Sequence, residues 1–253
     1  MFKRKKGAGQ SAFLPNFGLS FSPFWKAQDP PGEKRIVLPD VTWQQYMTLL
    51  DEMGLERTTR LTYLRHKLEM MNPMPEHERC RKLIDSLVLV LGDELRSPIT
   101  AIAPVLLLSP DYHFGAEPDA CYYVQTQPPA GVPTKPDELA KGGRPAELHL
   151  PPDPVPDILV EVAITKSLLN KFPAYAQLGI PEIWYYFTKQ GEDVLKGDLF
   201  IYQLRGQEYI EANRSAVFPC LPAERVLLFL EHSDSMGLPK SLVVLREWIQ
   251  RHC

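Results

Sequence analysis

The sequence predicts an α/β protein with a mixed, twisted β-sheet flanked by helices. The chain has 253 residues, of which 44% are hydrophobic, so it can bury one sizeable core. Apolar residues recur at helical spacing in several segments and form short runs rich in β-branched and aromatic residues in others. A strand, a helix and a strand follow one another over residues 157–187. Such alternation is typical of an α/β fold.

The chain is expected to consist of an extension and one domain. Residues 1–38 contain scattered aromatic residues without a clear period, so we expect a flexible N-terminal extension. The basic run Lys3–Lys6 within it is most simply a solvated tail, although it could also contact phosphate. Residues 39–253 are expected to form a single domain, because they contain no internal repeat.

The first part of that domain predicts two helices and two strands. A helix follows Thr42, a capping residue, and ends at Gly54. Strands are expected over 60–64 and 68–71, joined by a tight turn. Pro75 suits the first turn of a long helix. The apolar stripe of this helix comprises Cys80, Leu83, Ile84, Leu87, Val88 and Leu91.

The second part of the domain is richer in strands. Strands are expected over 99–108 and 119–125. Residues 126–156 lack periodicity and are rich in Gly, Pro and Lys, which predicts a long loop. The remaining elements are a strand at 157–164, a helix at 167–178, a strand at 183–187, a hairpin of 199–204 and 208–211, and helices at 222–230 and 239–251.

Composition limits the classes of function. The formal net charge of −3 does not support a generally basic nucleic-acid binder, although a metal site could supply positive charge locally. The four cysteines lie in no CxxC pair, so we expect reduced thiols and an intracellular, cytoplasmic protein. No segment approaches the ~18 consecutive apolar residues of a membrane span, so no membrane partner is expected. The GxGxxG, P-loop, HExxH and GxSxG motifs are absent.

Glu161 is the most informative residue of the sequence. It interrupts the apolar run 157–164, which is typical of a central strand buried on both faces. An ionised carboxylate there is costly unless a metal ion, a lysine or a hydrogen-bond donor pairs with it. Glu161 is therefore either a site residue or one half of a structural salt bridge.

Asp119 is the expected partner of Glu161. It follows Pro118 at the start of a strand, where it is either a site residue or a simple turn aspartate. On neighbouring strands the two carboxylates could hold one divalent ion. Mg²⁺ suits such a site, with waters and phosphate oxygens as further ligands, and Mn²⁺ could substitute for it. The ion would stabilise charge on a scissile phosphate and activate water.

Four further residues are candidates for the same site. Lys166 and Lys171 follow the Glu161 strand, and either could orient a nucleophile or be an ordinary solvated lysine. Glu69 could reach the same cleft or face water. His77 begins the long helix, where a histidine is more often a surface or capping residue than a catalytic one.

The ordered motifs resemble the Uma-two-like family of restriction endonucleases, within the PD-(D/E)XK nuclease superfamily. The resemblance extends over residues 40–250. It is carried by Val41–Tyr46, Leu61–Leu64, Leu68–Pro73, Pro75–Glu78, Glu117–Tyr123, Pro156–Val162, Tyr175–Trp184 and Phe218–Pro222.

The resemblance implies a restriction-endonuclease-like core with two metal-binding acids, Asp119 and Glu161. The family's lysine two residues after the glutamate is absent, because Ala163 stands there. Lys171, on the helix that follows, is the implied replacement.

Other features of the family are kept or altered. Glu69 and His77 would be secondary members of the site. The family's Asp-Gly hairpin turn is replaced by Arg65 and His66, which requires another turn geometry. The loop 126–156 resembles an insertion that could reshape the substrate cleft.

Residues and resemblance together predict a Mg²⁺-dependent endonuclease that hydrolyses phosphodiester bonds in DNA. Homodimerisation is implied by the resemblance alone. The alternative is a nuclease-derived binding or interaction protein that no longer cleaves, which the acidic net charge and the missing strand lysine favour. A third reading is a metal-dependent hydrolase of a phosphodiester that is not a nucleic acid.

Overall fold

Two β-sheets with helices on their faces make up the described part of the chain. The computed structural model describes residues 33–54, 57–130, 146–188 and 196–253. The predicted α/β class, with mixed sheets and flanking helices, is confirmed, but the strands form two six-stranded sheets in place of one. The first sheet has the order β1-β3-β2-β6-β5-β8, and the second has the order β12-β11-β10-β9-β7-β4.

The elements have the following bounds. The first sheet comprises β1 (Lys34–Leu38), β2 (Arg60–Leu64), β3 (Lys67–Asn72), β5 (Val105–Ser109), β6 (Phe114–Ala116) and β8 (Ala146–His149). The second comprises β4 (Thr100–Ile102), β7 (Ala120–Tyr123), β9 (Ile158–Ala163), β10 (Glu182–Thr188), β11 (Gly197–Arg205) and β12 (Glu208–Ala212). The helices are α1 (Trp43–Met53), α2 (Pro75–Glu94), α4 (Phe172–Leu178), α5 (Ala223–Ser235) and α6 (Leu238–His252).

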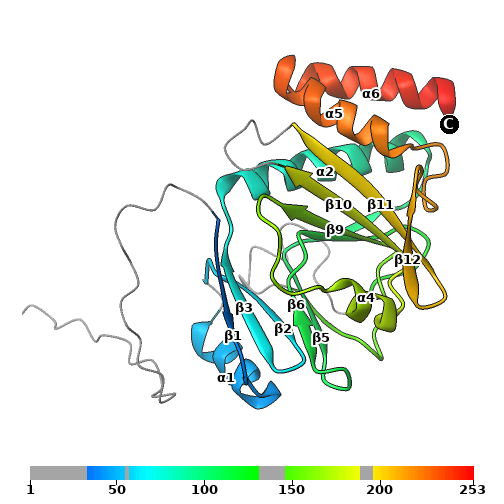
Figure 1. Cartoon of the computed structure of the whole chain (residues 1–253). Coiled ribbons are helices and arrows are strands. Elements are labelled where there is room, and N and C mark those ends of the chain that lie inside the picture. The colour runs from blue at the N-terminus through cyan, green and yellow to red at the C-terminus, as the bar shows by residue number, and fades with distance from the viewer. Residues whose placement is uncertain (1–32, 55–56, 131–145, 189–195) are drawn as a thin grey trace, which may run out of the picture. The chain divides into compact units, whose positions relative to one another are not determined.

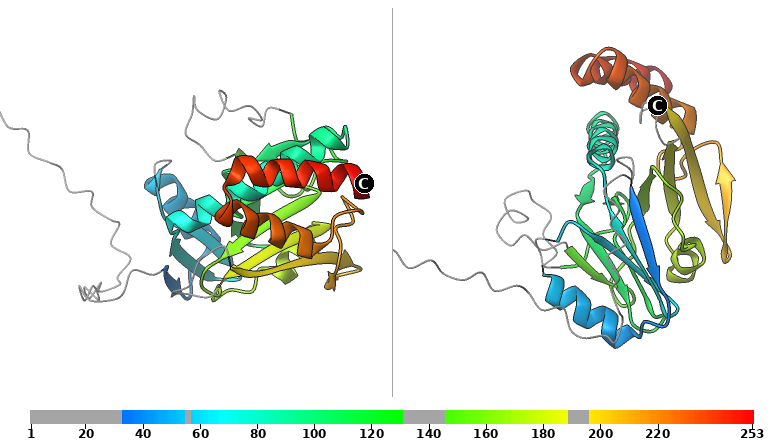
Figure 2. Two further views of the ribbon diagram at one scale, coloured as in Figure 1. Left: turned by 90° about the horizontal axis from the view of Figure 1, so that it is seen from above. Right: turned by 60° about the vertical axis from the view of Figure 1, so that its left-hand side comes forward.

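Figures 1 and 2 show how the sheets and helices are layered. Among the described residues, three apolar clusters hold these layers together. Side chains of both sheets, such as Leu107 and Leu159, meet with Tyr175 of α4 in a central cluster. The opposite face of the second sheet packs against α2, α5 and α6, around the buried Trp184. The opposite face of the first sheet packs against α1 through Tyr46. Both faces of β9 are therefore covered, as its continuous apolar run predicts.

The position of β9 fixes the geometry around Glu161. β9 pairs in parallel with β10, and this places Glu161 beside Tyr185. On its other side it pairs antiparallel with β7, where Val160 lies opposite Ala120. Asp119 directly precedes β7, so it lies next to Glu161 on the neighbouring strand. The expectation that the two acids lie on adjacent strands is confirmed.

Several element boundaries differ from the expected ones. The segment 34–38, expected within the flexible extension, is strand β1 and pairs antiparallel with β3; residues 1–32 lie outside the described part. The strand expected over 99–108 is divided into β4 and β5, since Pro104 has no N–H to donate to a sheet. The two parts join different sheets.

Two further boundaries bear on the site. Residues 146–149, expected within the loop 126–156, form β8 because β5 provides a parallel partner; residues 131–145 of that loop are not described. The helix expected over 167–178 begins only at Phe172, with Lys171 as its N-cap residue and a proline in its first turn. Lys171 therefore precedes the helix that it was expected to lie on.

The expectation of four reduced cysteines is wrong for two of them. Cys220 and Cys253 form a disulfide across 33 positions of the sequence. Cys80 and Cys121 are buried and are not in a disulfide. The spacing of the bonded pair has no local signature, because the two residues meet only after α5 and α6 have folded back. No helix of the described residues combines the length and the hydrophobicity needed to cross a membrane.

The disulfide gives a first prediction. Protein denatured without reductant should expose two titratable thiols, and protein denatured with reductant should expose four. Reduction should lower the free energy of unfolding by about 3 kcal/mol, because the link restricts the unfolded chain. Thiol titration and urea unfolding measure both effects. A Cys220→Ser/Cys253→Ser variant is the control, and its stability should not respond to reductant; four thiols in the unreduced protein would contradict the assignment.

Candidate active site

One cavity of about 530 Å³ contains the acidic residues that the sequence singled out. Its walls come from β1, β2 and β3 of the first sheet, from β9, β10 and β11 of the second, and from the segment 166–172. Asp119, Glu161, Lys171 and Glu69 all line it. His77 does not line the cavity, although it lies behind Asp119.

Asp119 is held in place from several directions. Its backbone N–H donates to the carbonyl of Val160 at 3.0 Å, and the N–H of Val162 donates to its Oδ2 at 2.6 Å. Asp119 is therefore attached to both neighbours of Glu161 in β9, to Val160 through its backbone N–H and to Val162 through its carboxylate. Arg60 Nη1 donates to Oδ1 at 2.5 Å. Burial raises the pKa of Asp119, but Arg60 and His77 outweigh it and hold that pKa well below its usual range, so the carboxylate is ionised.

Glu161 is paired rather than left alone in its apolar strand. Lys171 Nζ lies 2.7 Å from Oε2 and 2.6 Å from Oε1. The hydroxyl of Tyr175 donates to Oε1 at 2.5 Å. Only 7% of Glu161 is exposed. A desolvated carboxylate needs such partners, so Lys171 and Tyr175 both fix its position and offset its burial.

Lys171 and Tyr175 reach Glu161 from the N-terminal end of α4. They are four positions apart, so they project from the same side of the start of α4. Tyr175 is fully buried, and its hydroxyl contacts the site. Its spacing from Lys171 was the signal that could have identified it. Lys166, the other candidate lysine, is exposed and lines the same cavity.

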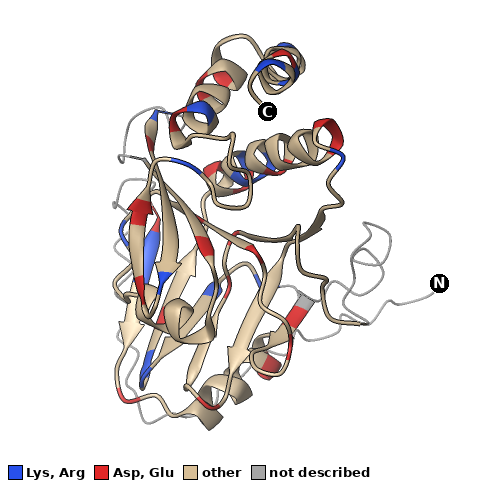
Figure 3. Cartoon of the chain, turned by 90° about the vertical axis from the view of Figure 1, so that its right-hand side faces the viewer, with Lys and Arg blue, Asp and Glu red and all other residues tan. Residues whose placement is uncertain are grey.

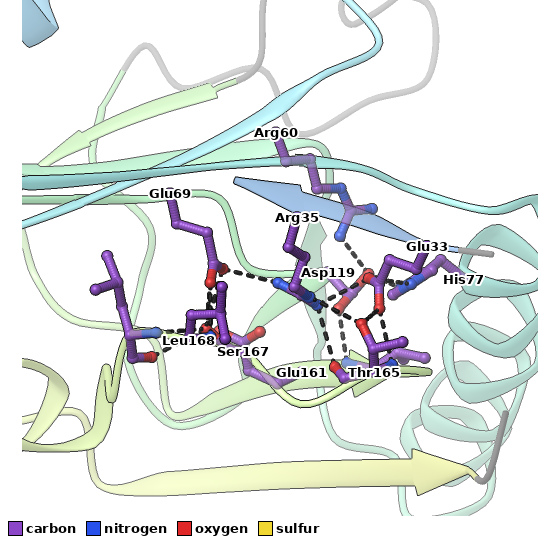
Figure 4. A network of polar contacts seen from close by, with 12 residues as sticks. Glu33, Arg35, Arg60, Glu69, His77, Asp119, Glu161, Thr165, Ser167 and Leu168 are labelled. Atoms are coloured by element: carbon purple, nitrogen blue, oxygen red, sulfur yellow. Dashed lines mark hydrogen bonds and ion pairs between the residues drawn. The ribbon is translucent and has the colours of Figure 1, made fainter. Parts of the chain in front are cut away.

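Glu69 holds a loop beside the cavity. Arg35 Nη1 donates to its Oε1 at 2.7 Å, and the backbone N–H of Leu168 donates to its Oε2 at 2.7 Å. The Ser167 hydroxyl donates to Oε1 at 3.0 Å (Figure 4). These bonds attach the segment between β9 and α4 to the first sheet. Glu69 lines the cleft, which is one of the two positions expected for it. There it orders the segment that leads to Lys171.

A buried pair of acids surrounds His77. Its Nε2 lies 3.0 Å from Glu33 Oε1, and its Nδ1 lies 3.8 Å from Asp119 Oδ1, which is too long for a hydrogen bond. Burial lowers the pKa of His77, but the adjacent carboxylates outweigh it and raise that pKa to about 9. His77 is therefore a buried imidazolium, where the sequence favoured a surface or capping residue.

Three residues of this network were not identified from the sequence. Glu33 and Arg35 lie in the segment assigned to the extension, and Arg60 begins β2. Glu33 accepts the N–H and hydroxyl of Thr165, and Arg35 Nη2 donates to Glu33 at 2.8 Å (Figure 4). The apolar run Ile36–Leu38, flanked by charged residues and a proline, was the signal for a strand there.

The two carboxylates suit an oxygen-preferring metal ion. Within the described ranges, no group of three or more His, Cys, Asp or Glu side chains gathers as a ligand set. Zinc sites usually need three or four such ligands, whereas Mg²⁺ is commonly held by one or two carboxylates with waters and substrate phosphate. Asp119 and Glu161 fit that second type. Their oxygens also bind Arg60 and Lys171, so an ion would compete with these two cations.

Comparisons with known proteins identify the family of the chain. A family model named Uma2, described as "Putative restriction endonuclease", matches residues 43–227. This match confirms the resemblance inferred from the ordered motifs. The crystal structure of "a putative nuclease belonging to DUF820" from Anabaena variabilis ATCC 29413 has 14% identity and a TM-score of 0.45, covering 75% of this chain and 99% of that one. No curated protein matches the chain significantly.

The buried imidazolium gives a second prediction. Because the pKa of His77 is raised from 6.5 to about 9, its charge stabilises the fold fully below about pH 6.5, and this contribution is lost as pH rises through 9. A shift of this size corresponds to about 3 kcal/mol. Urea unfolding across this range should show the loss in the wild type and a smaller loss in His77→Gln.

An NMR titration tests the same point without relying on a variant that folds well. The ring resonance of His77 in the wild type should change with an apparent pKa near 9. A His77 pKa at or below about 6.5 would show that the two acids do not hold the ring charged.

Proposed function

The chain belongs to the Uma2 family, and from this premise we propose that it is a Mg²⁺-dependent endonuclease that hydrolyses phosphodiester bonds in DNA. One observation carries the proposal: the chain brings Asp119, Glu161 and Lys171 to one cavity although Ala163 occupies the position of the usual lysine. Mn²⁺ is expected to substitute for Mg²⁺.

Each residue has a separate role in this proposal. Asp119 and Glu161 would hold the metal ion, which supplies charge stabilisation at the phosphate and a more acidic bound water. The contact with Glu161 holds Lys171 beside the proposed metal site. There Lys171 would orient the attacking water or offset developing charge on the phosphate. Tyr175 positions Glu161. Arg60, beside Asp119 on the cavity wall, would pair with a phosphate oxygen when the metal takes its place on the carboxylate.

Four other residues would act by positioning. Glu69 and Arg35 hold the segment 166–169, and this determines where Lys171 lies. His77 and Glu33 hold Asp119 from behind. His77 and Glu33 do not line the cavity, so they would act without contact with a substrate.

An opposing observation favours the second candidate function, a nuclease-derived binding protein. Both carboxylates are already neutralised, Asp119 by Arg60 and Glu161 by Lys171. If no divalent ion displaced these cations, the cavity would bind phosphate without cleaving it. Homodimerisation and a cytoplasmic location belong to the proposal as well, and sedimentation equilibrium tests the first of them.

The third prediction compares two lysines of the same cavity. Lys171→Met should lower the rate of plasmid cleavage in Mg²⁺ by about 10²- to 10³-fold, because the charge beside Glu161 is lost. Lys166→Met removes an exposed lysine from the same wall and should change that rate by less than about fivefold. Circular dichroism checks that both variants fold. Equal effects of the two substitutions would remove Lys171 from the catalytic set.

The fourth prediction concerns the acids. Glu161→Gln and Asp119→Asn should each lower cleavage by on the order of 10³-fold, since each removes a charge that holds the metal. Glu208→Gln, at an exposed glutamate of β12, should leave cleavage unchanged. Titration with Mn²⁺ should show binding to the wild type and weaker binding to Glu161→Gln. Wild-type cleavage in the folded Glu161→Gln variant would refute the proposed function.

Two substrates separate the remaining alternatives. Cleavage of a simple phosphodiester that plasmid DNA does not inhibit would favour a substrate other than nucleic acid. Binding of DNA without Mn²⁺ binding and without cleavage would favour the nuclease-derived binding protein.

A further inference from the structure

A group of aromatic side chains continues from the cavity along the second sheet. The group, called here the aromatic strip, comprises Phe172, Tyr185, Phe187, Phe200 and Tyr202. All five are partly exposed. Phe172, Tyr185 and Tyr202 line the cavity itself, together with Asp119 and Glu161.

The sheet register places the strip on the same face as the catalytic glutamate. Glu161 pairs with Tyr185, and Tyr185 pairs with Phe200, so the three form one row across β9, β10 and β11. Directly paired residues point to the same side of a sheet. Phe187 and Tyr202 lie two positions from Tyr185 and Phe200, so they point to that side as well. The strip therefore begins at the metal-binding acid and extends away from it.

The rings of the strip are arranged in near-parallel pairs along each strand. Tyr185 and Phe187 have ring centroids 6.5 Å apart with an interplanar angle of 9°. Phe200 and Tyr202 have centroids 6.2 Å apart with an angle of 26°. Phe172 packs edge-on against Tyr202 at 5.1 Å and holds the inner end of the strip. Planar, partly exposed rings in such a series are suited to stacking with other planar groups.

The net charge of the molecule favours stacking as a source of affinity. The net charge is −3, and acidic and basic side chains are interspersed on the helices (Figure 3). A net charge of −3 does not favour retention of duplex DNA through its phosphates alone. The basic groups that line the cavity are Arg35, Arg60, Lys166 and Lys171. They can neutralise a few phosphates near the site, so additional affinity must come from another source.

We propose that the aromatic strip binds unpaired bases of a single DNA strand whose scissile phosphate lies over Asp119 and Glu161. This rests on the proposed function and adds a substrate class, single-stranded DNA, to it. Bases of a single strand present their faces to aromatic rings, whereas those of a duplex are stacked on each other. The strip begins one strand away from Glu161, so nucleotides adjacent to the cleaved bond would be the ones that stack.

Binding experiments in EDTA test the strip separately from cleavage. The probes are a fluorescent thymidine 12-mer, an abasic strand of equal length and charge, and a duplex 12-mer. By fluorescence anisotropy, the wild type should bind the thymidine strand about tenfold more tightly than the abasic strand. Equal affinity for these two strands would overturn the proposal, because the phosphates alone would then account for binding.

Two substitutions at one position separate stacking from simple hydrophobic contact. Phe200→Leu should weaken binding of the thymidine strand about tenfold and change binding of the abasic strand by less than twofold. Phe200→Trp keeps a planar ring and should retain tight binding. Ile210→Ala is the control, because this 57% exposed residue points to the opposite face of the sheet. Unchanged thymidine binding by folded Phe200→Leu would overturn the proposal.

Three other outcomes would separate the proposal for the aromatic strip from the proposed endonuclease function. If Phe200→Leu abolished self-association in sedimentation experiments while leaving strand binding intact, a second copy of the chain would cover the strip, and the proposal would be wrong. If the wild type cleaved plasmid DNA but bound both strands equally, the proposal would fail and the endonuclease function would stand. Base-dependent binding without cleavage of any DNA would support the strip and count against the endonuclease function alone.

Discussion

The burial of Glu161 in an apolar strand is the constraint on which the candidate site depends. An ionised group at 7% exposure in β9 is stable only if the surrounding chain supplies partners. Lys171, just before α4, and Tyr175, within it, supply them, and this requires the segment after β9 to turn back over the strand. Glu69 and Arg35 fasten that segment to the first sheet. The need to provide partners for the buried Glu161 carboxylate thus accounts for the way in which the two sheets are connected at the cavity.

The chemistry of the site was predictable from the sequence because it follows from local patterns. A carboxylate in an apolar run is visible without a structure, and so is an aspartate at the start of a strand. Lys171 was identified through the family resemblance, and in the structure it contacts Glu161. Its place just before the helix was not predicted, because the effect of Pro173 on the helix start was given too little weight.

The parts that could not be predicted depend on partners far away in the sequence. β1 and β8 are short and carry weak patterns, and each exists because a distant strand offers hydrogen bonds. The same holds for the contact between Thr165 and Glu33, which are 132 positions apart. The Cys220–Cys253 disulfide is a third example. Local periodicity carries no information about such pairings, so the roles of Glu33 and Arg35 and the division of the strands into two sheets were not predicted.

The positive groups around the two acids explain how one cavity can suit both a metal ion and a phosphate. Asp119 and Glu161 carry two negative charges, and Arg60 and Lys171 balance them while no divalent ion is bound. If Asp119 and Glu161 held a divalent ion, Arg60 and Lys171 would no longer be needed to balance their charge. Both cations would stay on the cavity wall, where they could pair with a substrate phosphate. Metal binding and phosphate binding would then be mutually favourable, since each removes an unpaired charge that the other leaves behind.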